Sequence, residues 1–144
     1  MNRRVVCSVV VLGLIMGFAA SNSPAQREVE KNVDQTLKRL LTSRRDVLKR
    51  VYEVTKRRHE DGTGGFDSYI LARDAYLLAQ FELAESKKQR IEICKERVEN
   101  LRRLEESAKV RSESGSAKIE EQWIATAVRL QAEIDCVKEE SKPD

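Results

Sequence analysis

The segment that decides the fold is RHEDGTGGFDSYILA at residues 58–72, which returns in altered form as RSESGSAKIEEQWIA at residues 111–125. Gly62 of the first copy aligns with Gly115 of the second, 53 positions later (115 − 62). Beyond the turns, matching residues continue: Ala72, Leu77 and Ala79 align with Ala125, Leu130 and Ala132. Because similarity at a fixed offset constrains architecture strongly, we interpret the chain as an internally duplicated helical hairpin.

On both sides of these turns, the apolar residues have the spacing of long helices. No proline lies between Pro24 and Pro143. Apolar residues recur at alternating steps of three and four, as in a coiled-coil seam. The stripe before the first turn comprises Val33, Leu37, Leu40, Val47, Val51 and Val54, and the stripe after the second comprises Trp123, Ala127, Leu130, Ile134 and Val137. We therefore predict an all-α, elongated antiparallel coiled coil of hairpins whose buried seams are these stripes, with repeats at about 34–86 and 87–139.

The number of helices depends on the segment between the turns. The sequence contains no glycine or proline from residue 67 to residue 112. We therefore predict one long helix there, making three in all, with the two outer helices meeting end to end beside it. The alternative is a four-helix chain broken near Ser86, because Ser86 and Gln89 have the spacing of a capping box.

Glycines mark both reversals of the chain. Gly62, Gly64 and Gly65 supply conformational freedom at the first, and Gly115 is the expected left-handed residue of the second. Ser116 is a candidate N-cap for the helix that follows.

Residues 1–25 have the anatomy of a secretory signal peptide. Arg3 and Arg4 precede an apolar run, and Ser23-Pro24-Ala25 offers small residues before a cleavage point. The chain has 27 Lys and Arg against 24 Asp and Glu, and the leader holds two of the basic residues, so residues 26–144 carry a net charge of only +1 (25 − 24). We expect an exported protein of the periplasm or cell envelope, with residues 26–144 as a single domain and no membrane span once the leader is removed.

The two turn segments, residues 58–72 and 111–125, resemble the periplasmic helical repeats of the outer membrane efflux, or TolC-like, family. In that family a helix ends in a basic or aromatic residue shortly before a glycine, and an apolar residue, an acid and then alanine open the return helix. The resemblance covers about residues 34–139 and implies a periplasmic helical scaffold. It does not extend to the family's β-barrel, because residues 26–144 show no strand-like alternation.

Residue types needed for catalysis are missing or scattered, so we expect no enzyme activity and no cofactor. His59 is the only histidine, and with Glu60 and Asp61 it forms the one candidate site for a metal or small ligand. Export and the near-neutral charge argue against nucleic-acid binding by the basic residues at 49–58. The favoured function is a non-enzymatic envelope protein that associates with itself or with a helical envelope partner, and the alternative is a small ligand- or metal-binding sensor.

Two cysteines remain after the leader. Cys94 lies 21 residues before Gly115 (115 − 94) and Cys136 lies 21 residues after it (136 − 115). A hairpin that turns at Gly115 therefore brings them to the same height. Because the periplasm is oxidising, we predict a disulfide between Cys94 and Cys136.

Overall fold

The computed structural model describes residues 24–143, with side chains from residue 31 onward. The predicted signal peptide, residues 1–25, lies almost entirely outside this range. The described residues form four α-helices and no strand: α1 is Pro24–Glu60, α2 is Phe66–Leu83, α3 is Lys87–Glu113 and α4 is Ile119–Glu140. The prediction of an all-α chain is therefore confirmed.

The prediction of one continuous helix over residues 67–112 is wrong, and the four-helix alternative is correct. The chain leaves the helical conformation between Leu83 and Lys87. The Ser86 hydroxyl accepts a hydrogen bond from the Gln89 amide at 3.2 Å, and the Gln89 side chain accepts one from the Glu85 amide at 3.2 Å. These bonds satisfy amides at the start of α3, so a helix can begin there without a glycine or proline before it.

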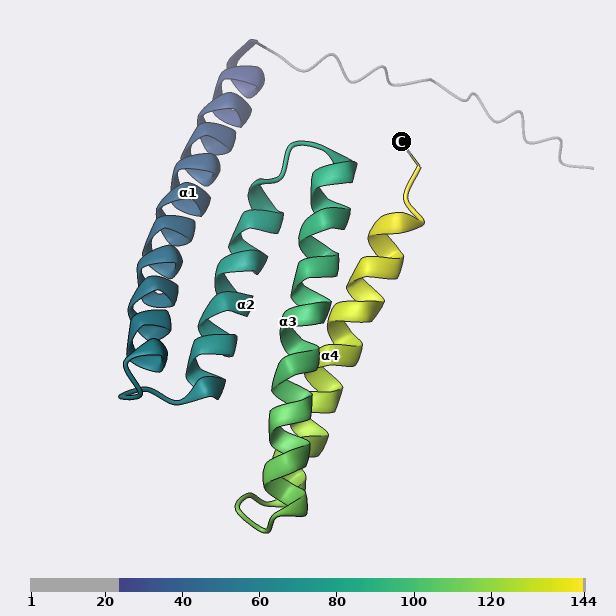
Figure 1. Ribbon diagram of the computed structural model, residues 1–144. Helices are drawn as coiled ribbons and strands as arrows, with labels where there is room; N and C mark the ends of the chain where they lie inside the picture. Colours follow the sequence, from purple (N-terminus) through teal and green to yellow (C-terminus); the bar gives the residue numbers. More distant parts are fainter. Residues whose placement is uncertain (1–23, 144) are drawn as a thin grey trace, which may run out of the picture.

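The four helices form an open row in which neighbouring helices run in opposite directions (Figure 1). Contacts between helices join α1 to α2, α2 to α3 and α3 to α4, and no other pair within residues 24–143 is in contact. The break near Ser86 folds α3 back beside α2, so α1 and α4 do not meet end to end as expected. Each inner helix thus has two neighbours and each outer helix has one.

Interdigitating aromatic and aliphatic side chains hold the row together. Tyr52 of α1 stacks on Tyr69 and Tyr76 of α2, with ring centroids 5.9 Å and 5.8 Å apart. Ile70 of α2 and Leu101 of α3 are fully buried. Apolar burial of this kind is the main stabilising contribution in a thin helical protein.

The two turns have the same backbone geometry. Gly62 has a φ of +69° and Gly115 a φ of +72°, a conformation that costs side-chain-bearing residues about 1–2 kcal/mol. The helix before each turn ends two residues before that glycine, and the helix after it begins four residues beyond it. The turn between α1 and α2 and the turn between α3 and α4 therefore have the same length and the same positive-φ glycine position.

Hydrogen bonds in the two turns match at the same offset. The Arg58 carbonyl accepts from the amides of Thr63 and Gly64, both at 2.8 Å. The Arg111 carbonyl, 53 positions later, accepts from the amides of Ser116 and Ala117 at 2.8 Å and 3.1 Å. These bonds satisfy carbonyl groups at the end of the preceding helix.

Ser116 lies in the second turn but is not the N-cap of α4. The N-cap is Lys118, without a side-chain hydrogen bond. The Ser116 amide is still bonded to the end of α3, so the next helix begins only after the chain has turned. The Ser116 hydroxyl instead accepts a hydrogen bond from the Ser114 hydroxyl at 3.1 Å.

Candidate functional site: the exposed faces of the outer helices

The apolar stripe of α1 faces outward, so the prediction that it forms a buried seam is wrong. Its six members are between 45% and 59% exposed: Val33, Leu37, Leu40, Val47, Val51 and Val54. The face of α1 that turns toward α2 lies one residue further along and carries Leu41, Leu48 and Tyr52, which are half-buried. Tyr52 decides this orientation, because the rings of Tyr69 and Tyr76 receive it.

The stripe of α4 is exposed in the same way, against the prediction. Trp123 is 62% exposed and Val137 is 64% exposed, while Leu130 and Ile134 are close to half exposed. The buried face of α4 instead carries three small residues, Ala125, Ala132 and Cys136, and ends at Glu139. Small side chains allow α4 to pack closely on α3, which leaves the bulky side chains outside.

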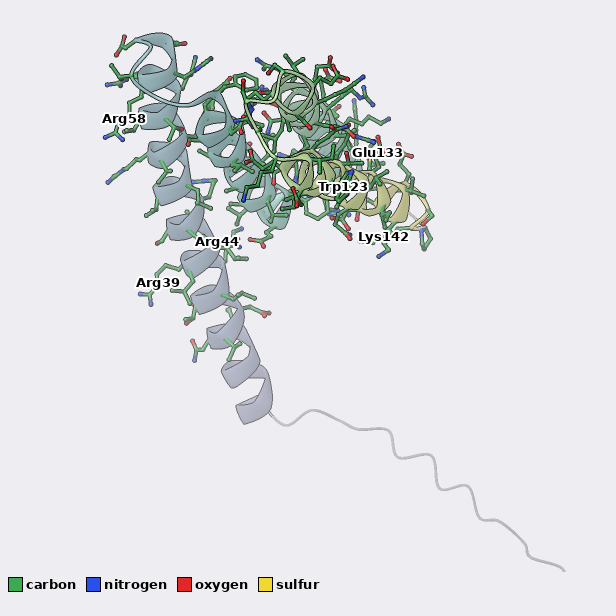
Figure 2. All side chains as sticks on the ribbon, turned by 90° about the horizontal axis from the view of Figure 1, so that it is seen from below. Arg39, Arg44, Arg58, Trp123, Glu133 and Lys142 are labelled. Atoms are coloured by element: carbon green, nitrogen blue, oxygen red, sulfur yellow. The ribbon has the colours of Figure 1, made fainter. Side chains whose placement is uncertain are left out.

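The N-terminal half of α1 stands clear of the other helices (Figure 2). α1 has 37 residues and α2 has 18, which corresponds to lengths of about 55 Å and 27 Å. Residues 31–40 are all exposed. A shallow hollow of about 490 Å³ opens on this part of the stripe, lined by Asn32, Val33, Thr36, Leu37 and Leu40. Residues spaced i, i+3, i+4 and i+7, as four of these are, form the hole that receives a side chain of a partner helix in coiled coils.

Arg44 fills the position of the α1 stripe between Leu40 and Val47, and a carboxylate of α2 pairs with its charge. Its guanidinium donates a hydrogen bond to the Glu82 carboxylate. This charge therefore has a partner within its own chain and does not block an apolar contact along the stripe.

Polar side chains join the inner helices. Arg97 is 8% exposed and donates to Asp74 of α2 at 3.0 Å. The buried Asn100 side chain donates to the Ile70 carbonyl at 2.9 Å. Near the turns, Arg111 donates to Asp67. Because a buried polar group must find its partner, these bonds fix how α2 and α3 lie against each other.

Cys94 and Cys136 face each other across the α3–α4 contact. Both are buried, and they lie 4.5 Å apart as free thiols. Burial raises the pKa of the Cys94 thiol to about 11, and the neighbouring Cys136 raises it further. Burial and the nearby Glu140 carboxylate also raise the pKa of Cys136, and a hydrogen bond with Cys94 opposes that shift.

The candidate site at His59 is occupied by aromatic packing. The imidazole stacks on Tyr69 and meets the edge of Phe66, with centroids 5.3 Å and 5.4 Å apart. Glu60 pairs with Lys56 at 3.7 Å. Over the part of the chain that the structure describes, no group of three or more His, Cys, Asp or Glu residues is arranged to hold a metal ion.

Spacing alone did not distinguish the exposed stripes from the buried faces. A useful signal was present in residue size: tyrosines on the inner face of α1 and alanines on the inner face of α4. No helix among residues 24–143 combines the length and the apolar character that a membrane crossing requires.

Comparison with known proteins adds no relative. No family model matches the chain, and neither curated proteins nor solved structures give a match.

Proposed function

We propose that this chain is a non-enzymatic protein of the periplasm or cell envelope that acts by helix-to-helix association. The exposed apolar stripe of α1 carries the proposal. Side chains spaced three and four residues apart present the face that a partner helix recognises. The stripe of α4 adds a second such face.

The proposal includes an origin by duplication of one helical hairpin. The matching turns support it, because both carbonyl acceptors and both positive-φ glycines recur at an offset of 53 residues. The resemblance of the turn segments to TolC-like proteins directs the search for a partner toward outer membrane efflux assemblies.

The proposed disulfide between Cys94 and Cys136 belongs to the same exported protein. The thiolate of one cysteine attacks the disulfide of an oxidant, forms a mixed disulfide and releases the other sulfur of the oxidant as a thiolate. The second cysteine then loses its proton and attacks the first cysteine's sulfur, which releases the remaining sulfur of the oxidant. Two electrons pass to the oxidant, and the α3–α4 hairpin gains a covalent link.

In vivo photo-crosslinking tests the function. A photoreactive residue at Leu37, in the middle of the exposed hollow, is expected to capture a helical segment of an envelope protein or of another copy of this chain. The matched control is Ile124, which is 64% exposed but lies off the α4 stripe. No capture at Leu37, equal capture at Leu37 and at the Ile124 control, or recovery of the chain in the cytoplasm with residues 1–25 intact would contradict the proposal.

The alternative function, a ligand- or metal-binding sensor, depends on His59. Its ring is packed against Phe66 and Tyr69, and no further observation favours this role.

A further inference from the structure

The outer face of α1 corresponds to the face of α3 that packs against α2. Arg97, Asn100 and Arg111 of α3 bond to α2. Their counterparts 53 positions earlier are Arg44, Val47 and Arg58 of α1. Arg44 and Val47 belong to the exposed stripe of α1, and Arg58 is the next position along it.

The outer face of α4 corresponds in turn to the face of α2 that packs against α3. Asp67 and Ile70 of α2 accept hydrogen bonds from α3. Their counterparts 53 positions later are Glu120 and Trp123, and both are exposed on α4. The outer face of α1 therefore resembles the α3 side of the α2–α3 contact, and the outer face of α4 resembles the α2 side.

We propose that a second copy of this chain docks head to tail, with α4 of one copy packed against α1 of the next as α2 packs against α3. This inference rests on the proposed function and names its partner. Because the two faces differ, the contact is heterologous and adds copies into an open chain, or into a ring if the rotation closes.

Charge and polarity at the corresponding positions suit this contact. At the place of the Arg111–Asp67 ion pair within one chain, the docked pair has Arg58 of one copy facing Glu120 of the other, with the same signs of charge. At the place of the buried hydrogen bond between Asn100 and Ile70, the docked pair has an apolar contact of Val47 of one copy with Trp123 of the other. An apolar pair requires no polar partner, so this replacement suits a contact that must form between separate molecules.

Arg44 is the position where the correspondence changes. Its counterpart Arg97 bonds to Asp74, whose own counterpart is Ala127. A second copy therefore offers Arg44 no carboxylate at that place. Arg44 already donates to Glu82 of its own α2, so docking does not leave the Arg44 charge without a partner.

The open row leaves room for the second copy. α1 has no neighbour other than α2, and α4 has none other than α3, within the described residues. Arg58 lies on α1 and Trp123 on α4, the two outer helices of the row (Figure 2). The end of α2 lies beside the start of α3 (Figure 1). The corresponding end of α4 carries Ile134 and Val137, both exposed. In the proposed contact, these side chains of one copy would pack against the part of the next copy's α1 where the hollow opens.

Paired substitutions test the inference on the full-length chain as purified from the cell. Val47→Asp and Trp123→Asp each place a carboxylate in one half of the contact. Each is expected to weaken self-association at least about a hundredfold, as measured by sedimentation equilibrium. The matched controls are Val110→Asp and Ile124→Asp, at positions that are 55% and 64% exposed and lie outside both faces. Circular dichroism checks that all four variants retain their helices.

Mixing gives the decisive result. Each variant keeps one intact face, so Val47→Asp and Trp123→Asp chains are expected to form a 1:1 heterodimer that grows no further. Trp123 is the chain's single tryptophan, so its burial at the contact should shift its emission to shorter wavelength. The wild type and both controls should show this shift, and the Val47→Asp chain alone should not. In the mixture, only the Val47→Asp chain contributes this signal.

Four outcomes overturn the inference. They are a wild type that stays monomeric at about 200 µM, single variants that still associate, a Trp123→Asp variant that associates while Val47→Asp does not, and a mixture that forms no heterodimer. The third outcome would indicate a symmetric contact of α1 with α1. A monomeric wild type whose Leu37 crosslinks to another helical protein leaves the proposed function standing and removes only self-association.

Discussion

Closing the disulfide between Cys94 and Cys136 is expected to stabilise the protein by about 2–4 kcal/mol. The bond would close a loop of about 40 residues, and loop entropy alone gives about 4 kcal/mol for that length. The two cysteines lie 4.5 Å apart and are not bonded, so their side chains must rotate to bring the sulfurs to a bond length of about 2.05 Å. Side-chain rotation on two packed helices removes part of the gain, which sets the lower limit.

Urea unfolding followed by circular dichroism measures this gain. With an m-value of about 2 kcal/mol per molar, the oxidised protein should unfold at a urea concentration about 1–2 M higher than the reduced protein. The double variant Cys94→Ala with Cys136→Ala is the control, and its unfolding should not respond to reductant. Two free thiols in folded protein recovered from an oxidising compartment would refute the reasoning, and an oxidised protein with an unchanged midpoint would refute the magnitude.

Three further predictions concern stability. An added Cβ at Gly64 would lie 2.7 Å from the Arg58 Cβ and 3.2 Å from its backbone carbon, whereas one at Gly65 meets nothing closer than 3.9 Å. Gly64→Ala should therefore lower the free energy of unfolding in urea by about 1–3 kcal/mol, and Gly65→Ala by less than about 0.5 kcal/mol. Equal losses for the two variants would contradict the turn geometry. Leu101 is fully buried between the inner helices and α4, so Leu101→Ala should lower the free energy of unfolding by about 2–5 kcal/mol, and a cost below about 1 kcal/mol would place it outside the core. Burial raises the pKa of Cys94 to about 11, so the folded chain keeps a proton that the unfolded chain releases near pH 8.5. The free energy of unfolding of the reduced protein should therefore fall as pH rises from about 8.5 toward 11. The fall per pH unit should be smaller in Cys94→Ala.

Helix content and turn positions could be predicted from the sequence because their causes are local. Gly62 and Gly115 mark the places where the chain needs a positive φ, and the apolar spacing between them fits helices alone. The Ser86 capping box was visible as well. Without a glycine or proline nearby, however, the sequence did not show that this cap would prevail over a continuous helix.

The candidate surface could be predicted only in part. Stripes on α1 and α4 were found from their spacing, but their direction was predicted wrongly. A helix with two neighbouring apolar faces has no local reason to bury one rather than the other. The choice depends on which face fits the side chains of the adjacent helix.

Four features of this protein can be read from the sequence alone: the helical spacing, the glycine reversals, the possible cap at Ser86 and the two cysteines equidistant from Gly115. Only the tertiary structure decided that α3 folds back beside α2 and that the stripes of α1 and α4 face outward. The physical reason is packing between residues far apart in sequence. Tyr52 enters the space between Tyr69 and Tyr76, and small residues bring α4 close to α3, so the bulkier stripes are left on the surface.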